Sequence, residues 1–323
     1  MARRVTALLA VLLVALLTSC QSDPGTDPAA AATGGEPATI ETKFGPVTAP
    51  TDPQRVVALG WGDAETALAL GVQPVGAADW LAFGGEGVGP WAEGMYDEPP
   101  EILGTLELSY EEVAALEPDL ILDVKSAGDQ QRYDQLSKIA PTIGVPEGAD
   151  NYTTGVELQV TMIGQALGVP DQAEQLLAEA DEQFAKAAAE HPEFAGKTVT
   201  AAAYSGNGWG AYVAETDRVQ FLERLGMQNN PAVDATETEE FSVPIAAENL
   251  DLLDADLLVV SPIGTTAKEI RANRVFQQVP AVKDGRYVIL DDPTISKAYS
   301  TNSTLSISYA LENVPDILSE ALS

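Results

Sequence analysis

The stretch PDQAEQLLAEADEQFAKAAAEH, residues 170–191, decides how this chain is organised. Its apolar side chains recur every three or four residues, and Glu, Gln, Asp and Lys fill the other positions, which predicts one amphipathic helix. Pro170 suits the first turn of a helix, whereas Pro192 cannot continue one, so the two prolines set its bounds. At about 1.5 Å per residue this helix is a rod of roughly 33 Å. We expect it to join two lobes across a cleft.

The segments before and after this helix share one plan. Residues 111–120 contain the spacing Glu-x4-Leu-x2-Asp-Leu, and residues 248–257 repeat it. Short apolar runs alternate with amphipathic helical segments in both halves, which predicts α/β lobes with mainly parallel sheets covered by helices. The expected divisions are a signal peptide over 1–20, a flexible tether over 21–43, an N-terminal lobe over 44–168, the interlobe helix over 169–192 and a C-terminal lobe over 193–323.

The spacing of apolar residues also predicts the individual strands and helices. In the first lobe it predicts strands at 55–59, 75–77, 119–124 and 142–145, and helices at 64–70, 110–116, 129–139 and 151–167. In the second lobe it predicts strands at 198–203, 256–260 and 286–290, helices at 217–225, 248–253, 268–278 and 305–322, and a glycine- and aromatic-rich loop at 204–216. Ser109 and Glu112 match a capping box at the start of one of these helices.

The amino terminus predicts export and anchoring. Arg3 and Arg4 precede a short apolar run, and Leu-Thr-Ser-Cys at 17–20 resembles the lipobox at which bacterial lipoproteins are cleaved and lipidated. An ordinary secretory signal with an incidental cysteine is the alternative, and the choice between Sec and twin-arginine export stays open. Cys20 is the single cysteine, so no intrachain disulfide can form. We expect a lipid anchor on Cys20 to hold the protein outside the cytoplasmic membrane.

Composition and charge exclude several classes of function. The formal net charge of −32 disfavours nucleic acid and anionic lipid headgroups as direct partners. The single histidine, His191, stands at the end of the long helix, which leaves no partner for a catalytic serine. Without a His or Cys cluster, a protein-ligated soft metal is also disfavoured. The sequence therefore predicts neither an enzyme nor a direct metal site, although a metal that arrives already chelated remains compatible.

Aromatic residues are the main candidates for ligand contact. The tryptophans, at 61, 80, 91 and 209, all fall in or near glycine-rich loops that follow predicted strands. Ligands of open parallel sheets bind outside the carboxyl ends of the strands. We therefore select the aromatic candidates Trp61, Trp80, Phe83, Tyr204, Trp209 and Tyr212. The alternative is that such side chains pack the loops against the core.

The order of these features resembles the Fe/B12-type periplasmic-binding family. The lipobox, Pro-Gln-Arg-Val-Val-Ala-Leu at 53–59, Glu-Pro-Asp-Leu-Ile-Leu at 117–122 and the long helix carry the resemblance, which covers roughly residues 40–323. It implies two Rossmann-like lobes joined by a single long helix, the class III periplasmic-binding-protein fold, with the ligand in the cleft. It also implies a substrate-binding lipoprotein of an ABC importer for a ferric siderophore, or alternatively for haem or a corrinoid.

The resemblance also suggests roles for charged residues. Arg218 matches an arginine that relatives direct at anionic chelate oxygens, and Lys125 is a second, weaker cationic candidate; a surface salt bridge is the alternative for Arg218. With only these two cations, a hydroxamate or mixed-type siderophore is favoured over a triscatecholate. Glu111 and Glu248 occupy the positions from which family members dock on permease arginines, although each could simply stabilise a helix start. We expect a monomer that meets iron only as a siderophore chelate.

Overall fold

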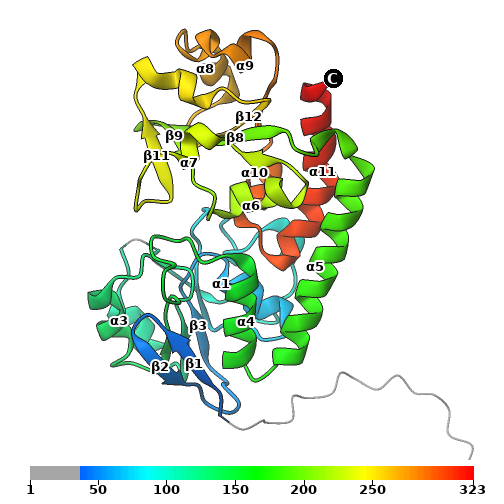
Figure 1. Ribbon diagram of the computed structural model, residues 1–323. Helices are drawn as coiled ribbons and strands as arrows, with labels where there is room; N and C mark the ends of the chain where they lie inside the picture. Colours follow the sequence, from blue (N-terminus) through cyan, green and yellow to red (C-terminus); the bar gives the residue numbers. More distant parts are fainter. Residues whose placement is uncertain (1–36, 106) are drawn as a thin grey trace, which may run out of the picture. The chain divides into compact units, whose positions relative to one another are not determined.

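The structure is a computed structural model that describes residues 37–105 and 107–323. Helix α5 spans Pro170–Glu190, as the spacing predicts, and runs alongside both lobes next to α11 (Figure 1). Its buried face is divided between two cores. Ala173 belongs to the hydrophobic cluster of the N-terminal lobe, whereas Ala180, Phe184 and Ala187 belong to a cluster of the C-terminal lobe. One amphipathic face thus ties the two lobes to the same helix.

The N-terminal lobe is built around a parallel sheet with strand order β5-β4-β3-β6-β7. Its strands are β3 (Val56–Ala58), β4 (Gly76–Ala78), β5 (Glu101–Leu103), β6 (Leu120–Leu122) and β7 (Thr142–Ile143). Its helices are α1 (Asp63–Ala69), η1 (Pro90–Ala92), α2 (Tyr110–Ala115), α3 (Gln130–Leu136) and α4 (Val156–Ala166). The middle strands β3, β4 and β6 are buried along their whole length, which is why they read as continuous apolar runs.

The C-terminal lobe has a mixed sheet with the order β11-β9-β8-β12-β13, and β10 also pairs with β8. Its strands are β8 (Thr198–Ser205), β9 (Gly208–Tyr212), β10 (Gln228–Asn229), β11 (Ser242–Ile245), β12 (Leu257–Pro262) and β13 (Tyr287–Ile289). Its helices are η2 (Pro192–Phe194), α6 (Asp217–Arg224), α7 (Pro231–Asp234), η3 (Ala247–Leu253), α8 (Ala267–Ala272), η4 (Phe276–Gln278), α9 (Pro280–Lys283), α10 (Pro293–Thr301) and α11 (Thr304–Leu322). The fold is therefore α/β with mainly parallel sheets, as predicted.

The repeated aspartate of the two halves has the same structural task in both lobes. Asp119 precedes β6 and accepts hydrogen bonds from the backbone N–H groups of Gln54 and Arg55, at 2.7 and 2.9 Å. Asp256 precedes β12 and accepts from the backbone N–H of Thr198 at 2.9 Å. Each carboxylate thus binds the start of the neighbouring parallel strand, β3 or β8. The spacing found in the sequence records a real structural repeat.

Several regions differ from the sequence prediction, which also lacks strands β5, β10 and β11. Residues 204–216 are not a loop, because β9 turns back on β8 as an antiparallel hairpin. The helix expected from residue 151 begins only at Val156, since Asn151 and Tyr152 have positive φ values of 54° and 64°. The helix expected over 268–278 is interrupted at Asn273, whose side chain accepts from the following backbone N–H groups. Helix α10 was not predicted at all.

The first described residues also form a paired structure. Strand β1 (Thr39–Thr42) pairs antiparallel with β2 (Gly45–Thr48), and β1 begins four residues before the expected end of the tether at residue 43. The predicted signal peptide and Cys20 lie outside the described residues. Among the described residues, no helix combines the length and the apolar character needed to cross a bilayer.

Candidate functional site

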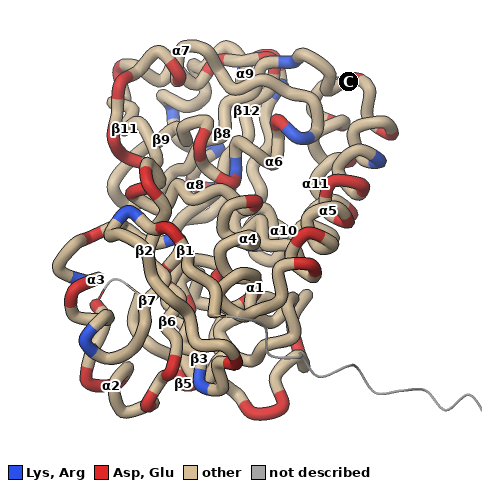
Figure 2. Tube along the Cα trace, turned by 60° about the horizontal axis from the view of Figure 1, so that its bottom comes forward, with Lys and Arg blue, Asp and Glu red and all other residues tan. Residues whose placement is uncertain are grey.

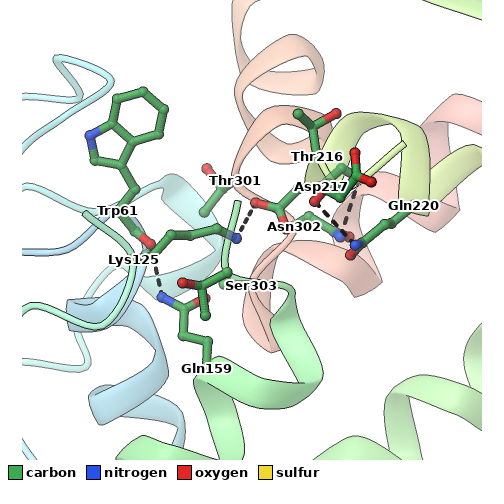
Figure 3. Close-up of polar contacts among 12 residues, drawn as sticks. Trp61, Lys125, Gln159, Thr216, Asp217, Gln220, Thr301, Asn302 and Ser303 are labelled. Carbon is green, nitrogen blue, oxygen red and sulfur yellow. Dashed lines mark hydrogen bonds and ion pairs between the residues drawn. The ribbon is translucent and has the colours of Figure 1, made fainter. Parts of the chain in front are cut away.

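An aromatic stack stands at the carboxyl ends of the first-lobe strands. Trp61 follows β3 and Trp80 follows β4, while Tyr152 lies in the loop before α4. The Trp61 ring lies between the other two, with centroids 4.3 Å from Trp80 and 3.8 Å from Tyr152 and interplanar angles of 10° and 18°. Its main-chain oxygen accepts a hydrogen bond from the Gln159 amide, as Figure 3 shows. Broad, flat aromatic faces are therefore gathered where the fold places ligands.

The stack continues into the C-terminal lobe. Phe241 meets Trp61 edge to face at 6.2 Å and lies 6.4 Å from Tyr212 at the end of β9. The guanidinium of Arg218 lies 4.5 Å from the centre of the Tyr212 ring, in cation–π geometry. Arg218 Nε is buried and finds no hydrogen-bond partner among the residues that the structure describes. A buried donor without a partner favours an incoming acceptor atom at this position.

A cavity of about 520 Å³ opens between the glycine-rich loop of the first lobe and the start of α10. Asp79 fixes the beginning of this loop, because its carboxylate accepts from the backbone N–H groups of Phe83 and Gly84, both at 2.8 Å. On the α10 side, Lys297 Nζ donates to the Ala82 carbonyl at 2.9 Å and lies 4.7 Å from the Phe83 ring centre. The cavity has the volume of a small-molecule site, with one cation on its wall.

Lys125 does not face an open site. Its ammonium lies 2.5 Å from Asp217 Oδ2 across the lobe boundary, and the whole residue is only 3% exposed (Figure 3). Its charge is thus neutralised by a carboxylate at the start of α6. The end of strand β6 does reach the interlobe boundary, but because the lysine is engaged there by an ion pair, we leave Lys125 out of the proposed contact set.

A second set of predicted residues is packed into the core. Trp209 is 6% exposed and stacks on Phe276 at 5.0 Å, in the cluster that covers one face of the C-terminal sheet. Tyr204 is half-buried and tilts against Trp209 at 4.6 Å. Tyr212 is buried as well, but it still carries Arg218 on its ring. For Trp209 and Tyr204, packing against the core is the arrangement observed, so we leave both out of the proposed contact set.

Three residues of the site were missed from the sequence. Tyr152 fell inside a stretch read as helix, Phe241 follows the acidic run TETEE, and Lys297 lies on the unpredicted α10. Phe241 left one signal in the sequence, because a large apolar side chain is unusual in an acidic, solvent-exposed loop. Lys297 left no comparable signal, because its place depends on how α10 packs.

Acidic groups surround the site. A cavity of about 480 Å³ lies between loops of both lobes and contains the carboxylates Asp150, Glu215, Asp234, Glu237, Glu239 and Glu240. Figure 2 shows acidic residues over both lobes and along α5 and α11. Across the described residues, no group of three or more His, Cys, Asp or Glu side chains could hold a metal ion. Glu111 and Glu248 are both exposed, in the first turns of α2 and η3.

The chain is similar to several known proteins and solved structures. The chain is 24% identical over 301 residues to the Fe(3+)-citrate-binding protein YfmC of Bacillus subtilis, with 90% of each chain covered. It is 29% identical over 171 residues to the iron(3+)-hydroxamate-binding protein YxeB of the same organism, covering 52% of this chain and 48% of the relative. The structure of PiaA from Streptococcus pneumoniae in complex with ferrichrome superposes with a TM-score of 0.77 at 25% identity, covering 88% of this chain and 98% of that one. The model of the family described as periplasmic binding protein matches residues 56–294, and the chain belongs to this family.

Proposed function

We propose that this protein captures a ferric siderophore between its lobes and delivers it to an ABC importer. The observation that carries the proposal is the aromatic stack, in which Trp80, Trp61 and Tyr152 of one lobe meet Phe241 of the other. A siderophore presents a large organic shell around its iron, and flat aromatic faces with one guanidinium suit such a shell. The names of the relatives, which include iron–citrate and iron–hydroxamate binders, support the same class.

The charges of the site favour a hydroxamate or mixed-type chelate. Because Lys125 is paired with Asp217, and Arg132 near Tyr152 is paired with Asp123, Arg218 and Lys297 are the cations left beside the stack and cavity among the described residues. The neighbouring acidic cavity carries a group of carboxylates. A ferric triscatecholate bears several negative charges and would be repelled, whereas a ferric trishydroxamate core is neutral. In this proposal all ligands to iron come from the chelator, and the protein contacts only the organic shell.

Location and delivery complete the proposal. Cleavage at Cys20 and lipidation would hold the protein on the outer face of the cytoplasmic membrane. In support, the relative YfiY of Bacillus subtilis is named a probable siderophore-binding lipoprotein. Glu111 and Glu248, exposed at matching places in the two lobes, would dock on a two-fold permease. The binding protein acts as a monomer in this scheme.

The direct test is calorimetric titration with chelates of graded charge. Ferrioxamine B carries one free ammonium, its N-acetyl derivative is neutral and its N-succinyl derivative is anionic, while the iron centre stays the same. We expect micromolar or tighter binding of the cationic and neutral forms, weaker binding of the anionic form, and none of ferric enterobactin. Tight binding of ferric enterobactin would overturn the hydroxamate assignment. Binding of haemin or cobalamin alone would overturn the siderophore assignment.

A further inference from the structure

The outer helical layer of the C-terminal lobe carries a group of exposed cations. Helices α8, η4 and α9 cover one face of the C-terminal sheet, at the end of the molecule that points away from the N-terminal lobe (Figure 1). The exposed basic side chains of this layer are Lys268, Arg271, Arg274 and Lys283. Within the described ranges 37–105 and 107–323, none of these four side chains forms an ion pair. The other exposed Lys and Arg side chains without an ion pair stand apart in the sequence, at 55, 138 and 197.

The local structure presents these cations to solvent and leaves them uncompensated. Lys268 and Arg271 are three residues apart on α8, so they lie on the same side of the helix, while Ile270 is fully buried. The nearest carboxylates in the sequence have other partners. Glu269 accepts from the Thr266 N–H in the capping box of α8, and Asp284 pairs with Arg286 at 3.0 Å. In a chain with 49 acidic and 17 basic residues, such a group of cations indicates an anionic partner outside the chain.

Exposed apolar side chains indicate what kind of anion this partner is. Ile263, before α8, is 47% exposed, and Val275, after α8, is 40% exposed. They are two of the four large hydrophobic side chains that are exposed in the part of the chain that the structure describes. A hydrated, soluble polyanion gains nothing from such side chains. At a bilayer surface, by contrast, apolar side chains enter the headgroup region while neighbouring cations meet the lipid phosphates. The combination therefore favours an anionic lipid surface.

The negative net charge of the chain does not prevent this contact. At about 0.1 M salt, electrostatic interactions decay over roughly 10 Å, so a bilayer responds to the charges nearest to it. The acidic residues along α5 and α11 (Figure 2) belong to another side of the lobe, because α11 packs on the opposite face of the C-terminal sheet from α8. An anionic bilayer repels those faces, which leaves the outer layer of the C-terminal lobe as the face that can approach it.

We propose that this outer layer binds the anionic headgroups of a lipid bilayer directly. The binding surface, which we call the α8 face, consists of Ile263, Lys268, Arg271, Arg274, Val275 and Lys283. The proposal depends neither on a siderophore nor on Cys20. If Cys20 is lipidated, the tether raises the local concentration of the bilayer, so that even a weak contact is populated. The α8 face then gives the tethered protein one resting orientation on the membrane.

The test is vesicle co-sedimentation of the chain from residue 20 onward, which contains every described element, with Cys20→Ser so that no lipid can be attached. The vesicles contain phosphatidylcholine alone or phosphatidylcholine and phosphatidylglycerol in equal parts. Lys268→Gln/Arg271→Gln removes two charges from the α8 face. Lys138→Gln/Lys186→Gln, also exposed but on other elements, changes the net charge equally and is the matched control. Val275→Ser tests the apolar contact, and long-chain polyphosphate serves as a soluble anion for comparison.

We expect the parent chain and the matched control to bind the mixed vesicles equally, and to bind phosphatidylcholine vesicles much more weakly. Each cation near the surface is worth roughly fivefold in the partition coefficient, so Lys268→Gln/Arg271→Gln should bind about thirtyfold more weakly. Val275→Ser should lower binding to vesicles and leave binding to polyphosphate unchanged. Failure of the parent chain to bind the mixed vesicles would overturn the proposal. Equal losses in both double variants would show that net charge decides rather than the α8 face. Full vesicle binding by Val275→Ser, together with tighter binding of the parent chain to polyphosphate, would overturn the lipid assignment.

Discussion

At the residue scale, Gly60 is where β3 turns into the site. A Cβ at this position would lie 2.2 Å from Asp63 Oδ2 and 2.7 Å from the backbone nitrogen of Lys125. We predict that Gly60→Ala lowers the free energy of unfolding by roughly 1–3 kcal/mol, because neither neighbour can move away freely. Asp63 Oδ2 accepts from the Val124 N–H, and the Lys125 carbonyl accepts from the Trp61 N–H. Gly206→Ala is the control, since no atom lies within 4 Å of its Cβ. Thermal melts of the two variants decide, and equal melting temperatures would contradict the prediction.

Asp63 makes stability depend on pH. Burial raises the pKa of its carboxyl from 3.8 to about 6, even though the Gln159 amide and the Val124 N–H donate to it. The folded protein thus keeps a proton that the unfolded chain releases near pH 4. The protonated Asp63 carboxyl therefore stabilises the folded state at low pH. About 3 kcal/mol of unfolding free energy is lost as the pH rises through 6 and the proton leaves. Urea unfolding of wild type and Asp63→Asn at pH 4 and 7 should show this change in their difference; a difference that does not vary with pH would refute it.

Local sequence was informative about some single residues and silent about others. Trp61 and Trp80 could be selected because each directly follows a buried strand, and the carboxyl ends of parallel strands share one edge. Lys125 satisfied the same rule, but its partner Asp217 is 92 residues away in the sequence. Nothing near Lys125 indicated that its charge would be neutralised. The positions of Trp61 and Trp80 could therefore be predicted from the sequence pattern, whereas the ion pair of Lys125 could be found only in the tertiary structure.

At the element scale, Asp119 and Asp256 should contribute equally to the stability of their lobes. Asp119→Ala removes the acceptor of two backbone N–H groups before β3, and Asp256→Ala removes the acceptor at the start of β8. We predict that each variant loses about 1–3 kcal/mol of unfolding free energy, because the strand start loses its hydrogen-bond partner. Asp171→Ala, on the exposed start of α5, is the control. Urea unfolding gives the values; a loss in only one lobe would contradict the structural repeat.

Helices and strands with a strong hydrophobic period could be predicted from the sequence, whereas strands that depend on pairing with other strands could not. Helix α5 and the buried strands formed where their apolar spacing placed them. For the hairpin of β8 and β9 the sequence predicts a loop, because Gly206, Asn207 and Gly208 mark a turn and the glycines inside β9 weaken its strand pattern. Its identity as a strand comes from pairing with both β8 and β11. The pairing of β9 with the more distant β11 leaves no local pattern.

At the scale of the whole molecule, transport should be separable from binding. Glu111 and Glu248 are exposed on the two lobes, and neither is among the residues that line the two cavities described above. We predict that Glu111→Lys with Glu248→Lys leaves chelate affinity nearly unchanged but abolishes siderophore-dependent growth, because like charges then face each other at the permease, at a cost of several kcal/mol. Glu98→Lys with Glu320→Lys, one exposed glutamate on each lobe, reverses the same number of charges as a control. Normal growth of the first double variant would remove both glutamates from docking.

The most direct test of the account is a tryptophan fluorescence titration with ferrioxamine B, because it locates the chelate relative to named side chains. Wild type and Trp209→Phe should be quenched with the same Kd, since Trp209 belongs to the core. Trp61→Ala should weaken binding by on the order of 1–3 kcal/mol, because it removes the middle ring of the stack. Normal affinity in Trp61→Ala, together with loss of binding in Trp209→Phe, would contradict the claim that the interlobe aromatic stack holds the chelate.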